Sequence, residues 1–98
     1  MNFPERFYNL IGGYFSDQSL AEGAREMALA CEDNEQRYRD YLALLQWGMD
    51  AVAREDGAIM DLLERAYMVR PESFAAARAE LQSVKDAFEK AYQLELET

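Results

Sequence analysis

The residue types that usually carry enzyme chemistry are scarce in this chain. It contains no histidine and one cysteine, Cys31. Without histidine there is no Ser–His or Cys–His pair, no neutral-pH imidazole base, no Cys/His zinc site and no Glu-x-x-His di-iron pair. Two carboxylates could still act as general acid and base, but nothing singles out one pair among the nineteen acids. We therefore expect a protein that is not an enzyme and holds no metal ion or cofactor.

The chemistry that remains is electrostatic, because nineteen Asp and Glu oppose ten Lys and Arg and give a net charge of −9. The segment between residues 31 and 64 carries much of this charge. A clustered negative surface speeds the association of a basic protein and repels nucleic acid. We expect a partner to bind there through Trp47 and the acids Glu32, Asp33, Glu35, Asp40, Asp50, Glu55, Asp56, Asp61 and Glu64.

Both parts of this predicted site have another interpretation. Acidic side chains also form ordinary solvated surfaces, and they are favoured near helix N-termini, where several of these acids are expected. Trp47 is either an exposed anchor of an interface or a core residue of a central helix that is buried on two faces. The sequence leaves both alternatives open.

The elements that would position these residues are helices, and we predict an all-α, compact single-domain bundle of about five helices over residues 1–98. Ala, Leu, Glu, Arg and Gln dominate the composition, and all five favour helices. Half of the residues are apolar, which is enough for a modest core. The expected helices run from Pro4 to Gly12 or Tyr14, from Gln18 to Glu32, from a cap at Asp33 or Asn34 to Arg54 or Glu55, from a cap at Asp56 to Val69 or Arg70, and from Pro71 to Leu94.

Apolar spacing predicts how two of these helices pack. Cys31 shares one face of the second helix with Leu20, Ala24 and Met27, so we expect it to be a small buried hydrophobe. The last helix carries an apolar seam with alternating spacings of three and four, which predicts antiparallel packing within the chain rather than a coiled-coil dimer. The seam consists of Phe74, Ala77, Leu81, Val84, Phe88 and Ala91.

The first helix is strongly apolar and meets a glycine pair, Gly12-Gly13. This pair could end the helix with a left-handed turn, after which Ser16 or Asp17 would cap the next helix. It could instead allow another backbone to approach closely. We favour the turn.

The start of the chain also carries a family resemblance. It reads Phe-Pro-x-x-Phe-x-x-Leu-x-Gly-Gly-Tyr-Phe and then an acid, through Phe3, Pro4, Phe7, Leu10, Gly12, Gly13, Tyr14, Phe15 and Asp17. This pattern resembles the N-terminal signature of one family of contact-dependent growth inhibition immunity proteins. The resemblance implies an inhibitor of the C-terminal toxin domain of an effector delivered by neighbouring bacteria, often a nuclease such as a tRNase.

Charge and resemblance together define the expected partner. We expect a basic protein toxin domain bound by a monomer in a 1:1 heterodimer, with no direct binding to nucleic acid or to a membrane. No long apolar run or signal peptide is evident and the chain has one cysteine, so we expect a cytoplasmic protein. The alternative function is a small acidic helical adaptor or secretion chaperone that holds a client protein, dimerises through the last helix or exposes a long apolar channel.

Overall fold

Helices make up about four fifths of the structure. The computed structural model describes residues 2–67 and 69–97, so the parts of the predictions that fall on residues 1, 68 and 98 lie outside it. The described residues contain no strand, which confirms the predicted all-α bundle of five helices. The helices are α1 (Phe3–Phe15), α2 (Leu20–Ala30), α3 (Glu35–Ala53), α4 (Gly57–Tyr67) and α5 (Phe74–Glu97).

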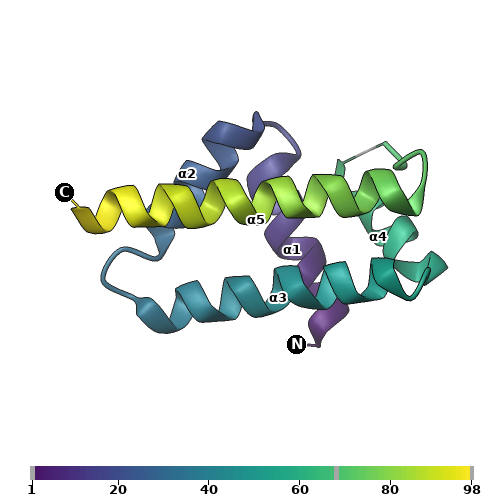
Figure 1. Ribbon diagram of the computed structural model, residues 1–98, viewed down its shortest axis with the longest axis horizontal. Coiled ribbons are helices and arrows are strands. Elements are labelled where there is room, and N and C mark those ends of the chain that lie inside the picture. Colours follow the sequence, from purple (N-terminus) through teal and green to yellow (C-terminus); the bar gives the residue numbers. More distant parts are fainter. Residues whose placement is uncertain (1, 68, 98) are drawn as a thin grey trace.

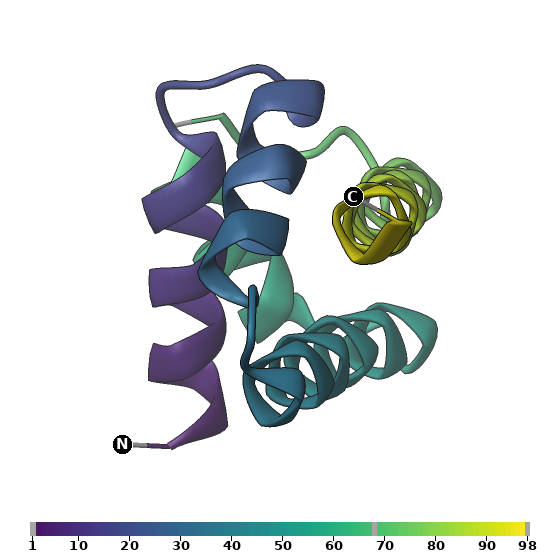
Figure 2. The same cartoon turned by 90° about the vertical axis from the view of Figure 1, so that its left-hand side faces the viewer.

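The two longest helices, α3 and α5, run in opposite directions along the long axis of the molecule (Figure 1). The shorter helices α1 and α2 lie together on one side of this pair, as the end-on view in Figure 2 shows. α5 packs mainly against α2 and α3, while α4 packs against α1. The core therefore lies where the α3–α5 pair meets the shorter helices.

The apolar seam of α5 faces this core. Leu81 and Phe88 are fully buried, and Phe88 contacts the rings of Tyr38 and Tyr41 on α3 at centroid distances of 5.2 and 5.9 Å. Tyr92 continues the contact by stacking on Tyr38 at 3.8 Å. The predicted packing within the chain is confirmed, so this face of α5 is not available for a coiled-coil dimer.

α3 is the central helix. Its buried residues lie on two sides, because it packs against both α1 and α5. Close packing with α1 depends on Gly48, where an added Cβ would lie 2.4 Å from the ring of Phe7. The second apolar face expected for this helix is therefore largely occupied by α1.

The favoured interpretation of the glycine pair is wrong, because α1 continues through Gly12 and Gly13 to Phe15. No glycine in the described residues has a positive φ. A side chain, rather than a left-handed turn, provides a hydrogen bond to a carbonyl group at the end of this helix: the Ser16 hydroxyl donates to the carbonyl of Gly12 at 2.6 Å. A Cβ on Gly12 would lie 3.9 Å from Cα of Ala66 on α4, which is an ordinary contact, so the packing of α1 on α4 does not require glycine at this position.

Alanine substitution can distinguish a glycine that is required for packing from one that is not. A Cβ on Gly13 would meet no described atom within 4 Å, so Gly13→Ala is expected to raise the free energy of unfolding by about 1 kcal/mol. Gly23 provides the contrast, because its Cβ would lie 2.5 Å from the carbonyl oxygen of Tyr14 and from the ring of Phe15. Gly23→Ala should therefore cost roughly 1–3 kcal/mol. Urea unfolding of both variants checks this, and a loss of stability in Gly13→Ala would contradict it.

α2 begins at Leu20 rather than Gln18, because the Ser19 hydroxyl caps it and accepts from the N–H of Glu22 at 3.2 Å. The start of this helix is also less buried than predicted, since Leu20 is 43% exposed. Cys31 is fully buried, as predicted, and this burial raises the pKa of its thiol.

α5 begins at Phe74, three residues later than the predicted start at Pro71. The hydroxyl of Ser73 accepts from the N–H of Ala76 at 3.0 Å and so supplies the cap. The helix then continues to Glu97, past the predicted end. A capping hydroxyl, rather than the proline, decides where this helix starts.

Candidate partner-binding surface

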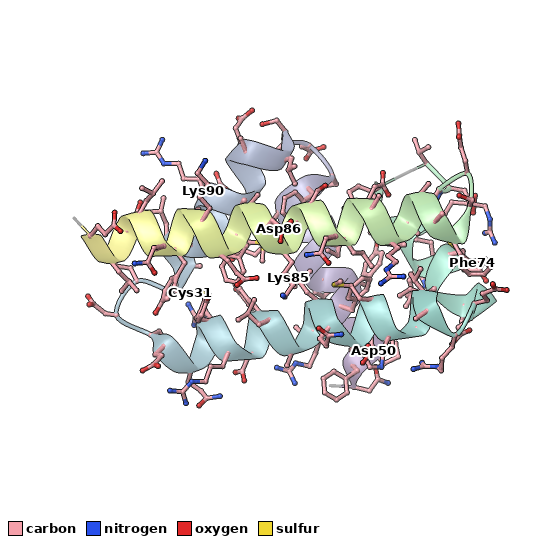
Figure 3. All side chains as sticks on the ribbon, in the orientation of Figure 1. Cys31, Asp50, Phe74, Lys85, Asp86 and Lys90 are labelled. Carbon is pink, nitrogen blue, oxygen red and sulfur yellow. The ribbon has the colours of Figure 1, made fainter. Side chains whose placement is uncertain are left out.

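The predicted acids do not form one patch, because six of them gather at opposite ends of α3. The nineteen residues of α3 separate these ends by about 28 Å. Figure 3 shows this separation, since Cys31 beside one end and Asp50 towards the other lie far apart along the molecule. We call these sets the turn group (Glu32, Asp33 and Glu35) and the corner group (Asp50, Glu55 and Asp56).

Arginines accompany the turn group. Glu35 pairs with Arg39 at 2.7 Å, although both side chains are largely exposed, so this pair contributes little stability. Arg37 donates to the carbonyl of Ala30 at 2.8 Å, which places a second guanidinium at the same turn. Much of the negative charge of the turn group is therefore offset locally.

The remaining three acids also have partners within the chain. Asp61 and Glu64 on α4 lie 2.7 and 3.8 Å from Nη1 of Arg70. Asp40 is half-buried and accepts from the side-chain amide of Gln36 at 2.9 Å.

The corner group has hydrogen bonds of its own, from the side-chain amide of Gln46 to Asp50 at 2.8 Å and from the N–H of Ala58 to Asp56 at 2.9 Å. Among the described residues, however, no lysine or arginine forms an ion pair with the corner group, so its charge is the most available to a partner.

Trp47 lies one turn before Asp50 on α3 and is half-buried. Its ring stacks on Phe3 at 6.2 Å with an interplanar angle of 10°, and it meets Phe7 at 5.5 Å with an angle of 58°. Phe7 is fully buried, whereas Phe3 is 46% exposed. Trp47 therefore lies at the edge of the core, held by α1, with part of its ring accessible.

The corner between α3 and α4 is an unusual helix end. The N–H of Glu55 donates to the carbonyl of Val52 at 2.9 Å, and the N–H of Asp56 donates to that of Ala51 at 3.1 Å. These two bonds form a Schellman motif, whose left-handed position is usually glycine. Glu55 occupies that position with a φ of 55°. A carboxylate is therefore held at a position where glycine would relieve strain.

Glu55→Gly is expected to raise the free energy of unfolding by about 1 kcal/mol, because a left-handed conformation costs non-glycine residues roughly that much. Asp33 is the matched control, since it has a φ of 59° at the other end of α3. Aspartate tolerates this conformation better than glutamate, so Asp33→Gly should give a smaller gain. Urea midpoints of the two variants make the comparison, and equal gains would contradict it.

A groove lies beside the corner, between the end of α3 and the start of α5. It encloses about 550 Å³, and its lining includes Val52, Phe74 and Glu55. Val52 is buried and Phe74 half-buried, so the floor is apolar. The exposed side chains of Glu55, Arg78 and Gln82 line the groove as well, so its rim carries both signs of charge. Figure 3 shows Phe74 and Asp50 towards the same end of the molecule. Sequence reasoning missed this groove because its two walls are separated by the whole of α4.

A second hollow lies on the other side of α5, where α1 ends and α2 begins. It encloses about 360 Å³, and Phe15, Tyr67 and Glu80 contribute to its lining. Burial, and then the charge of Glu80, raises the pKa of Tyr67, while partial burial raises the pKa of Glu80. Among the residues that line this hollow, Leu20 and Val84 in apolar helix faces and Phe15 in the N-terminal signature had a sequence signal, but none of them indicated a hollow.

Two kinds of site are not found in residues 2–67 and 69–97. No three Cys, Asp or Glu side chains gather there in a way that could hold a metal ion. None of the described helices has the length and apolar character needed to span a membrane.

No family model, curated protein or solved structure matches this chain. The resemblance to immunity proteins therefore rests on the residues between Phe3 and Asp17. Several of them, including Phe7, Leu10 and Phe15, are buried. Much of this signature therefore forms part of the scaffold.

Proposed function

We propose that this chain is an immunity protein that binds and neutralises the C-terminal toxin domain of a contact-dependent growth inhibition effector. The supporting observation is Glu55, held in a left-handed conformation at an apolar groove in a chain of net charge −9. Strained residues tend to lie at functional sites. A carboxylate retained at the cost of stability is consistent with recognition of a basic folded domain.

Neutralisation in this proposal needs no catalysis by the chain. A nuclease toxin, such as a tRNase, has a cationic cleft that binds the phosphates of its substrate. An acidic monomer can cover that cleft or bind beside it and block the substrate sterically, in a 1:1 complex formed in the cytoplasm. The corner group would supply long-range attraction in either arrangement, and the apolar groove would supply the close contact.

The packing of α5 favours this proposal over an adaptor or secretion chaperone. A chaperone was expected to dimerise through the last helix or to expose a long apolar channel. The seam residues Leu81 and Phe88 are fully buried within the chain. The two hollows lie on opposite sides of the N-terminal half of α5, where Ala79 lines both of them, and they do not form one channel.

The test is rescue from a toxin. The C-terminal domain of the protein encoded directly upstream should arrest growth when expressed alone, and co-expression of this chain should restore growth. Size-exclusion chromatography with light scattering should then show a 1:1 complex whose affinity falls steeply with salt. An upstream gene that encodes no large secreted effector, or a toxic domain that this chain fails to neutralise, would overturn the proposal.

A further inference from the structure

The hollow beside Glu80 has apolar walls and one acidic side chain. Its apolar lining consists of the buried Phe15 and Val84 together with Leu20, Tyr67 and Ala79. Its volume of about 360 Å³ is within the range of small ligand sites. Among the described residues that line it there is no lysine or arginine. Its shape and composition suit a group with an apolar body and a positive end.

The carboxylate of Glu80 is available for such a group. In the described part of the chain, no cation forms an ion pair with it, whereas Asp61 has Arg70 at 2.7 Å. The nearby amide of Gln18 is already committed, since its Nε2 donates to the carbonyl of Tyr14 and to Glu26, both at 3.0 Å. The side chain of Glu80 is exposed, and partial burial of its carboxylate raises its pKa.

We propose that this hollow receives a lysine or arginine side chain of the basic partner, with the aliphatic stem against Phe15 and Leu20 and the charged head on Glu80. The inference rests on the proposed function, which supplies the partner. Lysine and arginine bury their stems along apolar surfaces while the charged head finds a carboxylate. Arginine is also among the residues that contribute most at protein interfaces.

The same contact defines the face that the partner covers. Ala79 lines both the Glu80 hollow and the groove at Glu55, so the N-terminal half of α5 is a low ridge between them. A domain seated on this ridge reaches Glu55 on one side and Glu80 on the other. The connection between α1 and α2, beside the Glu80 hollow, lies above the middle of α5 in Figure 1.

The test uses the full chain and n-butylguanidinium as a probe for the arginine side chain. In ¹H–¹⁵N correlation spectra, the probe should shift the amides around Leu20 and Ser83, which line the hollow, and saturate at millimolar concentration. Glu80→Gln keeps the shape of the side chain and removes its charge, so it should weaken probe binding at least fivefold. Glu97→Gln, at the far end of the same helix, should leave probe binding unchanged.

The probe without its charge is the second control. n-Butanol has the same apolar tail, and it should bind much more weakly than n-butylguanidinium. Equal binding of the two probes, or unchanged binding in Glu80→Gln, would mean that the hollow does not recognise a cation. No saturable shift at the hollow would overturn the inference as well.

This test can fail separately from the proposed function, because it needs no partner. If the probe binds through Glu80 but the upstream domain is not neutralised, the proposed function fails and the cation site remains. If the chain neutralises the toxin while Glu80→Gln weakens neither probe nor toxin binding, the cation site fails and the function remains.

Discussion

Phe88→Ala is expected to lower the free energy of unfolding by about 3–5 kcal/mol. Phe88 is fully buried and joins α5 to α3 through the rings of Tyr38 and Tyr41, so its loss leaves a cavity at the centre of the bundle. For a chain of this size each kcal/mol corresponds to a fall in melting temperature of roughly 4–8 °C. Thermal and urea unfolding followed by circular dichroism would measure the change.

Phe74→Ala is the matched control, because the same side chain lies on the same helix but is only half-buried. It should cost less than half as much stability as Phe88→Ala, since part of its ring already contacts solvent. A similar loss for the two variants, or a small loss for Phe88→Ala, would contradict the assignment of Phe88 to the centre of the core.

The seam of α5 could be predicted from sequence because helical periodicity translates spacing directly into a shared face. The same reasoning placed Cys31 in the core correctly. Its limits appear at Leu20, which follows the periodic pattern of α2 but lies at the open end of that helix, where no neighbour covers it fully. Periodicity identifies which residues share a face of a helix. Burial also requires that another element pack against that face at the same position along the helix.

The role of each glycine could not be predicted, because it depends on which atoms of other helices lie nearby. Gly13 faces open space among the described atoms, while Gly48 accommodates the ring of Phe7. Helix starts were uncertain for a related reason. Ser16 and Ser19 are both good caps, and the structure uses Ser19 at the start of α2 while Ser16 bonds back to α1.

The candidate surface was predicted only in part. Nine acids are close in sequence, but six of them lie at the two distant ends of α3, and arginines pair with Glu35, Asp61 and Glu64. Glu80 lies outside that segment and had no sequence signal, because its environment is made by α1, α2 and α4. Charge clustering along a chain becomes clustering in space only where no long helix intervenes.

Reversing two charges of the corner group should give the largest effect on binding. Asp50→Lys combined with Glu55→Lys is expected to reduce the association rate with the toxin domain about tenfold at physiological salt, because opposite charge guides the encounter. Neither residue is buried, so helical content should not change. Asp56 is left intact because its carboxylate accepts from the N–H of Ala58 at 2.9 Å and supports the start of α4. Stopped-flow or surface plasmon resonance would measure the rate.

The matched control reverses two charges of the turn group, Glu32→Lys with Glu35→Lys, and changes the net charge by the same amount. If the partner docks at the corner, this pair should change the association rate by less than about threefold, since charges more than a Debye length of about 8 Å from the contact are largely screened at physiological salt. Equal losses for the two pairs would show that only net charge matters. A larger loss of association rate for the turn-group pair would show that the partner contacts the other end of α3. The role assigned to Glu55 would then be wrong.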